Sequence, residues 1–363
     1  MTENRDHRAI SYSFASAAVG VIIMRLIVYF VPIYAETYGV SLALDALFSL
    51  PTQLIFFLLI PFLIFKFYGK RTFRGVMEYS SAGKFEPYFL LAIPLGIFVW
   101  LTTIGISSLW QTLLSMTGFY LPSSVTPKPE TFNFGFFVAD VLLTAVLPAV
   151  CEEFCMRGGA LTTAKKAFGA TGCIVFCAIA FGLFHQNVKQ VFYTACFGAL
   201  AAFTVIKTKS IYPAMIMHFV NNFCSVLFDY ASDYGWMGGG VYDWIDYLSQ
   251  NQIWALVATF LCVVGITAGL IVLICYMRDK RVIKKKIETV KDSGFDVTNG
   301  RVVLMGEFSE ERVKALEMER EVFGKDYKEA RFKPKARDIA VGIGACVLTV
   351  LTTLFTYVWG FFY

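Results

Sequence analysis

Long apolar stretches are the feature that most constrains this chain. Runs of 18 or more mostly apolar residues recur from near the beginning of the 363-residue sequence to its end. A helix needs about 20 such residues to cross a hydrocarbon core about 30 Å thick. Because backbone N–H and C=O groups in lipid must be paired within the protein, each stretch is expected to be helical. The sequence therefore predicts an all-α fold, a polytopic transmembrane helical bundle.

The composition agrees with a membrane protein and argues against other classes. Hydrophobic residues make up 57% of the chain and charged residues only 16%, against about 25% charged residues in soluble domains. The formal net charge of +5 is not gathered on a basic face with exposed aromatic residues, so the lipid bilayer, and not nucleic acid, is the expected partner. The nine cysteines lie in apolar stretches without a CxxC pair, which predicts buried thiols rather than disulfides.

Hydropathy predicts eight or nine membrane spans. The candidates lie approximately at residues 10–34, 42–65, 88–117, 134–162, 168–187, 190–206, 211–231, 252–276 and 338–361. Lys and Arg residues cluster in alternate loops, and such loops face the cytoplasm. The pattern predicts a multi-pass protein of the cell membrane, with the N-terminus and residues 277–337 in the cytoplasm.

The spans and loops divide the chain into five segments. Their predicted bounds are 1–131 for the N-terminal transmembrane helices, 132–232 for a catalytic transmembrane core, 233–276 for a loop and one transmembrane helix, 277–337 for a small cytoplasmic insertion, and 338–363 for a final transmembrane helix. The insertion mixes basic and acidic residues, and it contains an alternating run at 301–304 and a helix-like run at 310–321. It is expected to form a small module with a hairpin and a helix.

Ionisable residues inside apolar helices are the natural candidates for chemistry, because each costs about 2.5–3.5 kcal/mol at the bilayer centre. Such residues are Glu152, Glu153, Arg157, His185 and His218. Glu153 and Arg157 are four residues apart and should pair on one helix face, an arrangement that fits a structural ion pair as well as a catalytic one. Glu152 points about 100° away, lacks that partner and is the candidate general base.

Two further spacings place polar groups on common helix faces. His218 and Asn222 are four residues apart, as are Phe181 and His185, so the Phe181 ring can pack beside the imidazole. These groups suit the addition of water to a carbonyl group. Glu152 would take a proton from water with the help of His185, while His218 and Asn222 would donate hydrogen bonds to the developing oxyanion.

The three motifs together resemble the CAAX protease and bacteriocin-processing family (CPBP, or Abi) of intramembrane proteases, and in particular its type II CAAX prenyl endopeptidases. That family's pattern of EExxxR, FxxxH and HxxxN on successive helices is present as Glu152-Glu153 with Arg157, Phe181 with His185, and His218 with Asn222. The similarity covers about residues 132–232. It implies Glu152, Glu153, His185, His218 and Asn222 as catalytic residues, with Arg157 and Phe181 as orienting residues.

The resemblance implies an intramembrane endopeptidase with a glutamate-activated water in a conical cavity. Its substrate would be a membrane protein or a lipidated peptide, either a prenylated CaaX tail or a bacteriocin-type precursor. A zinc-dependent metalloendopeptidase is the alternative, with Glu152, His185 and His218 as the ligands. The chain has no HExxH motif and Asn222 is a poor zinc ligand, so the interpretation without a cofactor is favoured.

Two other classes of function stay open from the sequence. A non-catalytic membrane scaffold would tolerate the loss of Glu152, whereas a protease would not. An ion- or proton-handling protein is expected to have internal repeats or broken helix pairs, and no repeat is evident in the sequence. The sequence contains no signal for an oligomeric state.

Overall fold

The computed structural model describes residues 2–30, 38–68, 85–119, 128–236, 240–292, 295–298, 301–304 and 336–359. The chain divides into two compact units, of which the first comprises Met1–Leu270 and Arg331–Tyr363 and the second Ile271–Ala330. The described part of the first unit is helical. The predicted polytopic helical membrane bundle is therefore confirmed.

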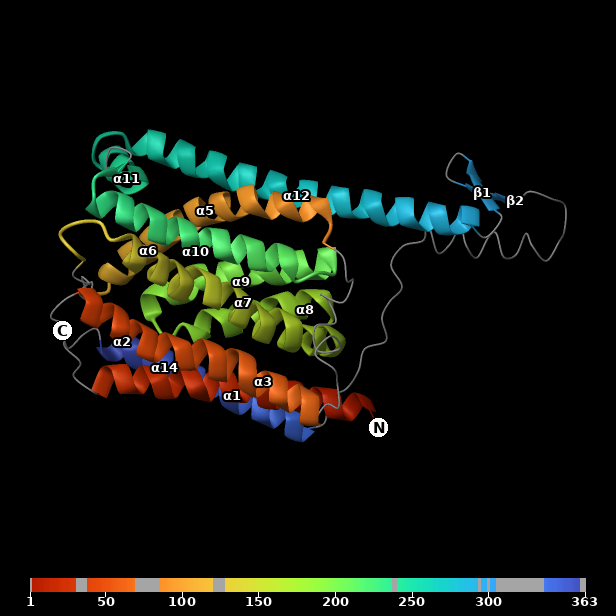
Figure 1. Ribbon diagram of the computed structural model, residues 1–363, viewed down its shortest axis with the longest axis horizontal. Helices are drawn as coiled ribbons and strands as arrows, with labels where there is room; N and C mark the ends of the chain where they lie inside the picture. The colour runs from red at the N-terminus through yellow and green to blue at the C-terminus, as the bar shows by residue number, and fades with distance from the viewer. Residues whose placement is uncertain are drawn as a thin grey trace. The chain divides into compact units, whose positions relative to one another are not determined.

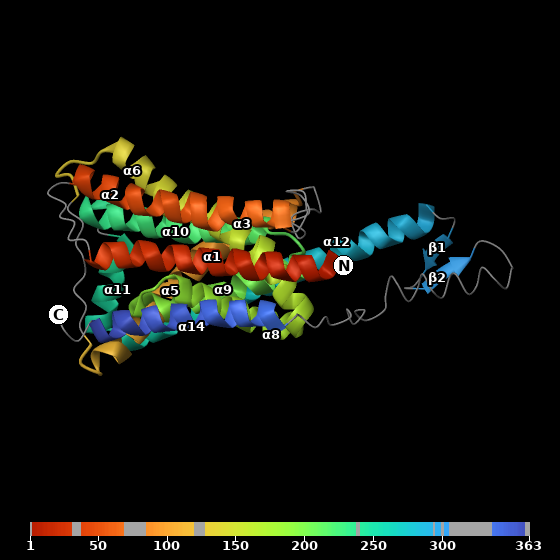
Figure 2. The ribbon, with the colours of Figure 1, turned by 90° about the horizontal axis from the view of Figure 1, so that it is seen from below.

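The helices of the first unit lie side by side in two perpendicular views (Figure 1 and Figure 2). The N-terminal part contains α1 (Thr2–Phe30), α2 (Tyr38–Leu50), the π-helix η1 (Pro51–Leu59), α3 (Ile60–Leu63), the π-helix η2 (Ile64–Tyr68), the 3-10 helix η3 (Pro87–Leu91) and α5 (Ala92–Ser115). The central part contains α6 (Phe134–Asp140), the π-helix η4 (Val141–Val146), α7 (Leu147–Glu153), the π-helix η5 (Phe154–Ala160), α8 (Leu161–Phe184), α9 (Val188–Thr208) and α10 (Tyr212–Asp233). The remaining helices are α11 (Gly240–Asn251), α14 (Ala336–Trp359) and α12 (Ile253–Asp292), which continues into the second unit.

Within the described residues, five helical segments are long and apolar enough to cross a membrane. They are Ser41–Leu63, Pro87–Ser115, Phe134–Ala160, Val188–Thr208 and Ile253–Lys291. Three shorter apolar helices, Ser11–Ile27, Phe168–Phe184 and Ile343–Phe355, coincide with other predicted spans. The predicted span 211–231 corresponds to α10, a helix that carries several polar side chains and is not among these apolar segments.

Glycines allow α8 and α9 to pack with their backbones close together. A Cβ atom added at Gly182 would lie 2.6 Å from the carbonyl oxygen of Val191, and one added at Gly198 would lie 2.9 Å from the Cβ atom of Phe181. Small residues at such positions are typical of helix contacts in membranes. The close approach brings the C-terminal end of α8 against α9. This end carries Phe181 and leads directly into His185.

Helices from both ends of the chain cover this central part. The views agree that α1 and α14 lie side by side, and both contact α8 (Figure 1 and Figure 2). The π-helix η1 contacts α7, while α5 packs along α10 and α9. The central helices are thus enclosed by segments that are distant in the sequence.

The described part of the second unit contains the end of α12 and a two-stranded antiparallel hairpin. Its strands are β1 (Phe295–Thr298) and β2 (Arg301–Leu304), with Phe295 opposite Leu304. The hairpin predicted from the alternating run is confirmed, and it is a local exception to the all-α fold. The helix predicted at 310–321 lies outside the described residues.

The prediction that all cysteines are buried is wrong for two positions. Cys196 and Cys262 are exposed on the helix surface, and Cys275 is half-buried. No disulfide links the eight cysteines for which the structure describes a side chain. An apolar helix face that can meet lipid does not need to bury its thiols within the protein, which explains the difference.

Candidate active site

The second glutamate of the pair lies in a closed ion pair. Arg157 Nη1 donates to Glu153 Oε1 over 2.8 Å, and both side chains have no exposed surface. The predicted pair is therefore confirmed. The same Glu153 oxygen lies 2.9 Å from Nδ1 of His218, a contact that helical spacing alone did not predict.

The arginine of this pair is held on its other sides as well. Arg157 Nη2 donates to the carbonyl oxygen of Gly198 over 3.2 Å, and its guanidinium carbon lies 4.5 Å from the centre of the Phe181 ring. A buried charge needs such partners, because an unpaired one is strongly destabilising. The network therefore ties η5, α8, α9 and α10 together around Glu153.

The first glutamate lies on another face, as predicted, and opens to a cavity. Glu152 is half-buried, and its Oε1 atom accepts a hydrogen bond of 2.7 Å from Gln53 Nε2. Gln53 comes from η1, 99 residues earlier in the chain, and is only 6% exposed. Sequence reasoning missed it, although a glutamine inside the apolar run 42–65 was a usable signal.

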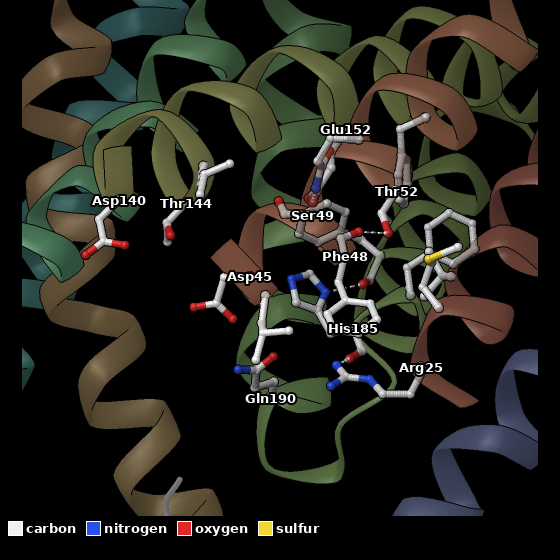
Figure 3. A pocket seen from close by; sticks show the side chains of 18 of the residues that line it. Arg25, Asp45, Phe48, Ser49, Thr52, Asp140, Thr144, Glu152, His185 and Gln190 are labelled. Atoms are coloured by element: carbon white, nitrogen blue, oxygen red, sulfur yellow. Dashed lines mark hydrogen bonds between the residues drawn. The ribbon is translucent and has the colours of Figure 1, made fainter. Parts of the chain in front are cut away.

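His185 lies at the turn between α8 and α9. Its Nδ1 atom is 2.9 Å from the carbonyl oxygen of Phe181, and the two rings are 5.0 Å apart. The predicted packing of Phe181 beside the imidazole is confirmed. From α1, Arg25 Nη2 donates to the backbone oxygen of His185 over 2.8 Å (Figure 3), so a flanking helix fixes this turn.

The hydrogen bonds also assign the tautomers of both histidines. A carbonyl oxygen only accepts, so Nδ1 of His185 carries hydrogen and faces Phe181. Glu153 Oε1 already accepts from Arg157 and likewise requires a donor, so Nδ1 of His218 carries hydrogen. In each neutral ring, Nε2 is then the atom with a lone pair.

One cavity of about 850 Å³ brings the predicted reacting groups together. Its lining includes Glu152, His185, His218 and Asn222, from α7, the α8–α9 turn and α10. Asn222 Nδ2 donates to the carbonyl oxygen of Thr144 over 2.9 Å. Because this fixes the direction of the amide, Asn222 presents one further N–H group as a possible donor.

A second cavity, of about 730 Å³, shares Glu152 and His185 with the first. It extends among the N-terminal helices, where Arg25, Asp45 and Gln53 line it. In Figure 3, the Asp45 side chain points toward the space between Asp140 and His185. The two glutamates therefore differ in access, because Glu152 meets both cavities and Glu153 meets neither.

Three π-helical segments border the site. η1 carries Gln53, η4 immediately precedes α7, and η5 carries Arg157. Pro148 lies at the change from η4 to α7, where its missing N–H group removes a helical hydrogen bond. Such π-helical turns are frequent at functional sites because they change the direction in which side chains point.

A zinc site built on the ligands named from the sequence would need Glu152, His185 and His218 close to one point. Glu152, His185 and His218 line one cavity, but no group of three His, Cys, Asp or Glu side chains in the described part of the chain could hold a metal ion. A zinc site needs at least three protein ligands at about 2.0–2.3 Å. The arrangement instead offers a carboxylate, two imidazoles and an amide around a cavity large enough for a peptide bond.

The fold is a polytopic bundle of membrane helices, and one of its cavities is lined by a carboxylate, two imidazoles and an amide. Residues 134–224 match the sequence model of the Rce1-like type II CAAX prenyl endopeptidases. These residues thus form an Rce1-like domain, which confirms the resemblance drawn from the three motifs and indicates a CAAX-type membrane protease. No curated protein and no solved structure matches the chain.

Proposed function

We propose that this protein is an intramembrane endopeptidase that cleaves a membrane-associated substrate with a water molecule activated by Glu152. One observation carries the proposal. Glu152, His185, His218 and Asn222 line a single cavity inside the Rce1-like domain. A half-buried carboxylate beside a neutral imidazole is suited to general base catalysis.

In the proposed reaction, Glu152 takes one proton from water with the help of His185, which lines the same cavity. The remaining hydroxide oxygen forms a bond to the carbonyl carbon of the substrate. When the carbon–nitrogen bond breaks, the proton held by Glu152 passes to the departing amine. The step therefore balances without a metal ion or another co-reactant.

Asn222 and His218 stabilise the oxyanion that forms in this reaction. Asn222 contributes the N–H group that does not bind Thr144. His218 lines the same cavity and can donate through Nε2 in its doubly protonated form, while its Nδ1 atom stays 2.9 Å from Glu153 Oε1. Glu153 and Arg157 thus act through His218. Donors of this kind typically contribute a factor of about 10²–10³ in rate.

The matched family supports a substrate class for this proposal. A prenylated CaaX-type peptide is the first candidate, since the family's description names prenyl endopeptidases; a bacteriocin-type precursor is the second. The protein would act in the cell membrane, with its N-terminus and residues 277–337 in the cytoplasm. Activity without a bound metal ion is part of the proposal.

The test is cleavage of prenylated and membrane-tethered peptides by the purified full-length protein in detergent. Glu152→Gln should lower kcat at least about a hundredfold, whereas Glu130→Gln, the same change at an exposed loop position, should leave it unaltered. A chelator should not reduce the wild-type activity. Equal cleavage by wild type and Glu152→Gln would refute the mechanism, and loss of activity with chelator would favour a metalloprotease.

A further inference from the structure

The helices outside the matched segment place one buried polar side chain directly on the proposed general base. Gln53, in η1, donates from Nε2 to Glu152 Oε1 over 2.7 Å. The residue is 94% buried, because only 6% of its surface is exposed. Among the described residues, no other side chain donates a hydrogen bond to Glu152.

The orientation of the Gln53 amide follows from charge. Its two ends are distinguished by the groups around them, and the end that faces an ionised carboxylate must be the donor. A donor on Oε1 fixes the rotation of the Glu152 carboxyl group and leaves Oε2 as the oxygen that can take a proton.

The other end of the same amide points to a ligand. Gln53 Oε1 is buried and has no hydrogen-bond partner among the described residues, although buried carbonyl oxygens normally have a donor. Gln53 lines the cavity of about 730 Å³ that Glu152 and His185 also line. A water molecule beside Glu152 would supply the donor that this oxygen lacks.

We propose that Gln53 is a positioning residue for the reaction: its Nε2 atom orients the Glu152 carboxylate, and its Oε1 atom receives a hydrogen bond from the water that Glu152 deprotonates. This inference rests on the proposed function and extends the machinery beyond the Rce1-like domain. The π-helix η1 is then part of the active site, although it lies outside residues 134–224. It also explains why an apolar membrane segment contains a glutamine.

The test is a set of Gln53 variants assayed with the peptides that the wild type cleaves. Gln53→Met keeps the length of the side chain and removes both hydrogen-bonding groups, so kcat should fall about 10- to 100-fold with KM within twofold. Gln53→Glu should recover activity as the pH falls, because the introduced carboxyl group donates only when it is protonated. Gln252→Met, at an exposed position, is the control for the glutamine-to-methionine change.

A second measurement does not require activity. Dicyclohexylcarbodiimide modifies protonated carboxyl groups in apolar surroundings, and mass spectrometry locates the modified residue. In Gln53→Met, Glu152 should be modified faster than in the wild type at the same pH, because the hydrogen bond that holds its Oε1 atom is gone. An unchanged rate of modification would overturn the inference, whether or not any peptide is cleaved.

The two proposals fail in different ways. If Glu152→Gln is inactive and Gln53→Met retains the wild-type kcat, the proposed function stands and the role of Gln53 is refuted. If Glu152→Gln cleaves as the wild type does, the proposed function is refuted. A lower kcat in Gln53→Met without acidic recovery in Gln53→Glu would indicate a structural role and would also overturn the inference.

Discussion

The ion pair in the matched segment and the turn that carries His185 are held in different ways. Glu153 and Arg157 find their partners, His218 and Gly198, within residues 134–224. The turn between α8 and α9 instead depends on helices outside that segment. The ion pair is therefore closed within the domain, whereas the turn is completed by the rest of the chain.

Three flanking helices reach the turn. Arg25 of α1 binds the backbone oxygen of His185, and Trp110 Nε1 of α5 donates to the backbone oxygen of Val188 over 2.7 Å. Gln186 Nε2 donates to the backbone oxygen of Thr349 in α14 over 3.4 Å. Gln186 is fully buried with a φ of 48°, a conformation that neighbouring structure must maintain. The domain supplies the reacting groups, and its surroundings hold one of them in place.

The largest effect is expected from removing the charge of Glu153 from its buried ion pair with Arg157. Glu153→Gln leaves the charge of Arg157 buried without its counter-ion and should destabilise the protein by about 3–5 kcal/mol. Glu152→Gln, the same change at the neighbouring position, should alter stability by less than about 1 kcal/mol. Unfolding in detergent, followed by circular dichroism, measures both. If Glu153→Gln combined with Arg157→Met is no more stable than Glu153→Gln alone, the ion-pair explanation is wrong.

The next effect concerns catalysis within the domain. Asn222→Ala should lower kcat about 10²- to 10³-fold, because it removes a donor to the oxyanion. Asn221→Ala should lower it by no more than about tenfold, because Asn221 only donates to Asn222 Oδ1 over 2.9 Å. Initial rates of peptide cleavage at saturating substrate provide the measurement. Equal losses in both variants would mean that Asn222 is not a separate oxyanion donor.

A smaller effect is expected when α1 loses its hydrogen bond to the turn between α8 and α9. Arg25→Met removes the 2.8 Å hydrogen bond to the His185 backbone and should lower kcat about tenfold, as expected for a hydrogen bond from a charged donor. Lys66→Met replaces an exposed cation of η2 and serves as the control. Unchanged kcat in Arg25→Met would show that the domain holds His185 without α1.

The smallest effect is expected when α5 loses its hydrogen bond to the same turn. Trp110→Phe loses the hydrogen bond to Val188 but keeps a ring to stack on Phe192, now 5.4 Å away. It should lower the free energy of unfolding by about 1 kcal/mol, with a few-fold change in kcat. Trp254→Phe, at a site 82% exposed, should change neither quantity. A tenfold loss of kcat in Trp110→Phe would mean that α5 supports the turn as strongly as α1 does.

The parts of the structure that the sequence predicts are those that the bilayer or a single helix determines. The bundle follows because lipid requires helical backbones. The Glu153–Arg157 pair follows because its members are four residues apart on one helix. By contrast, His218 is 65 residues from Glu153, so their contact depends on how two helices pack.

The contacts from the flanking helices join residues that are even further apart in the sequence. Gln53 is 99 residues from Glu152, and Arg25 is 160 residues from His185. Helical periodicity relates neighbours within one helix only and cannot pair residues across such intervals. The signal in the sequence was the presence of a polar residue in an apolar run, which predicts that a partner exists but not which residue it is.

The π-helical segment η4 has a consequence for how length can vary among relatives of this protein. A π-helix bonds each residue to the fifth one before it, and an α-helix to the fourth. Losing one residue from Val141–Val146 would let an α-helical turn replace a π-helical one, with Glu152 keeping its direction. A loss within a purely α-helical turn would rotate everything that follows by about 100° and turn Glu153 to the direction that Glu152 has now. Deletions in natural variants should therefore fall in η4 rather than in α7.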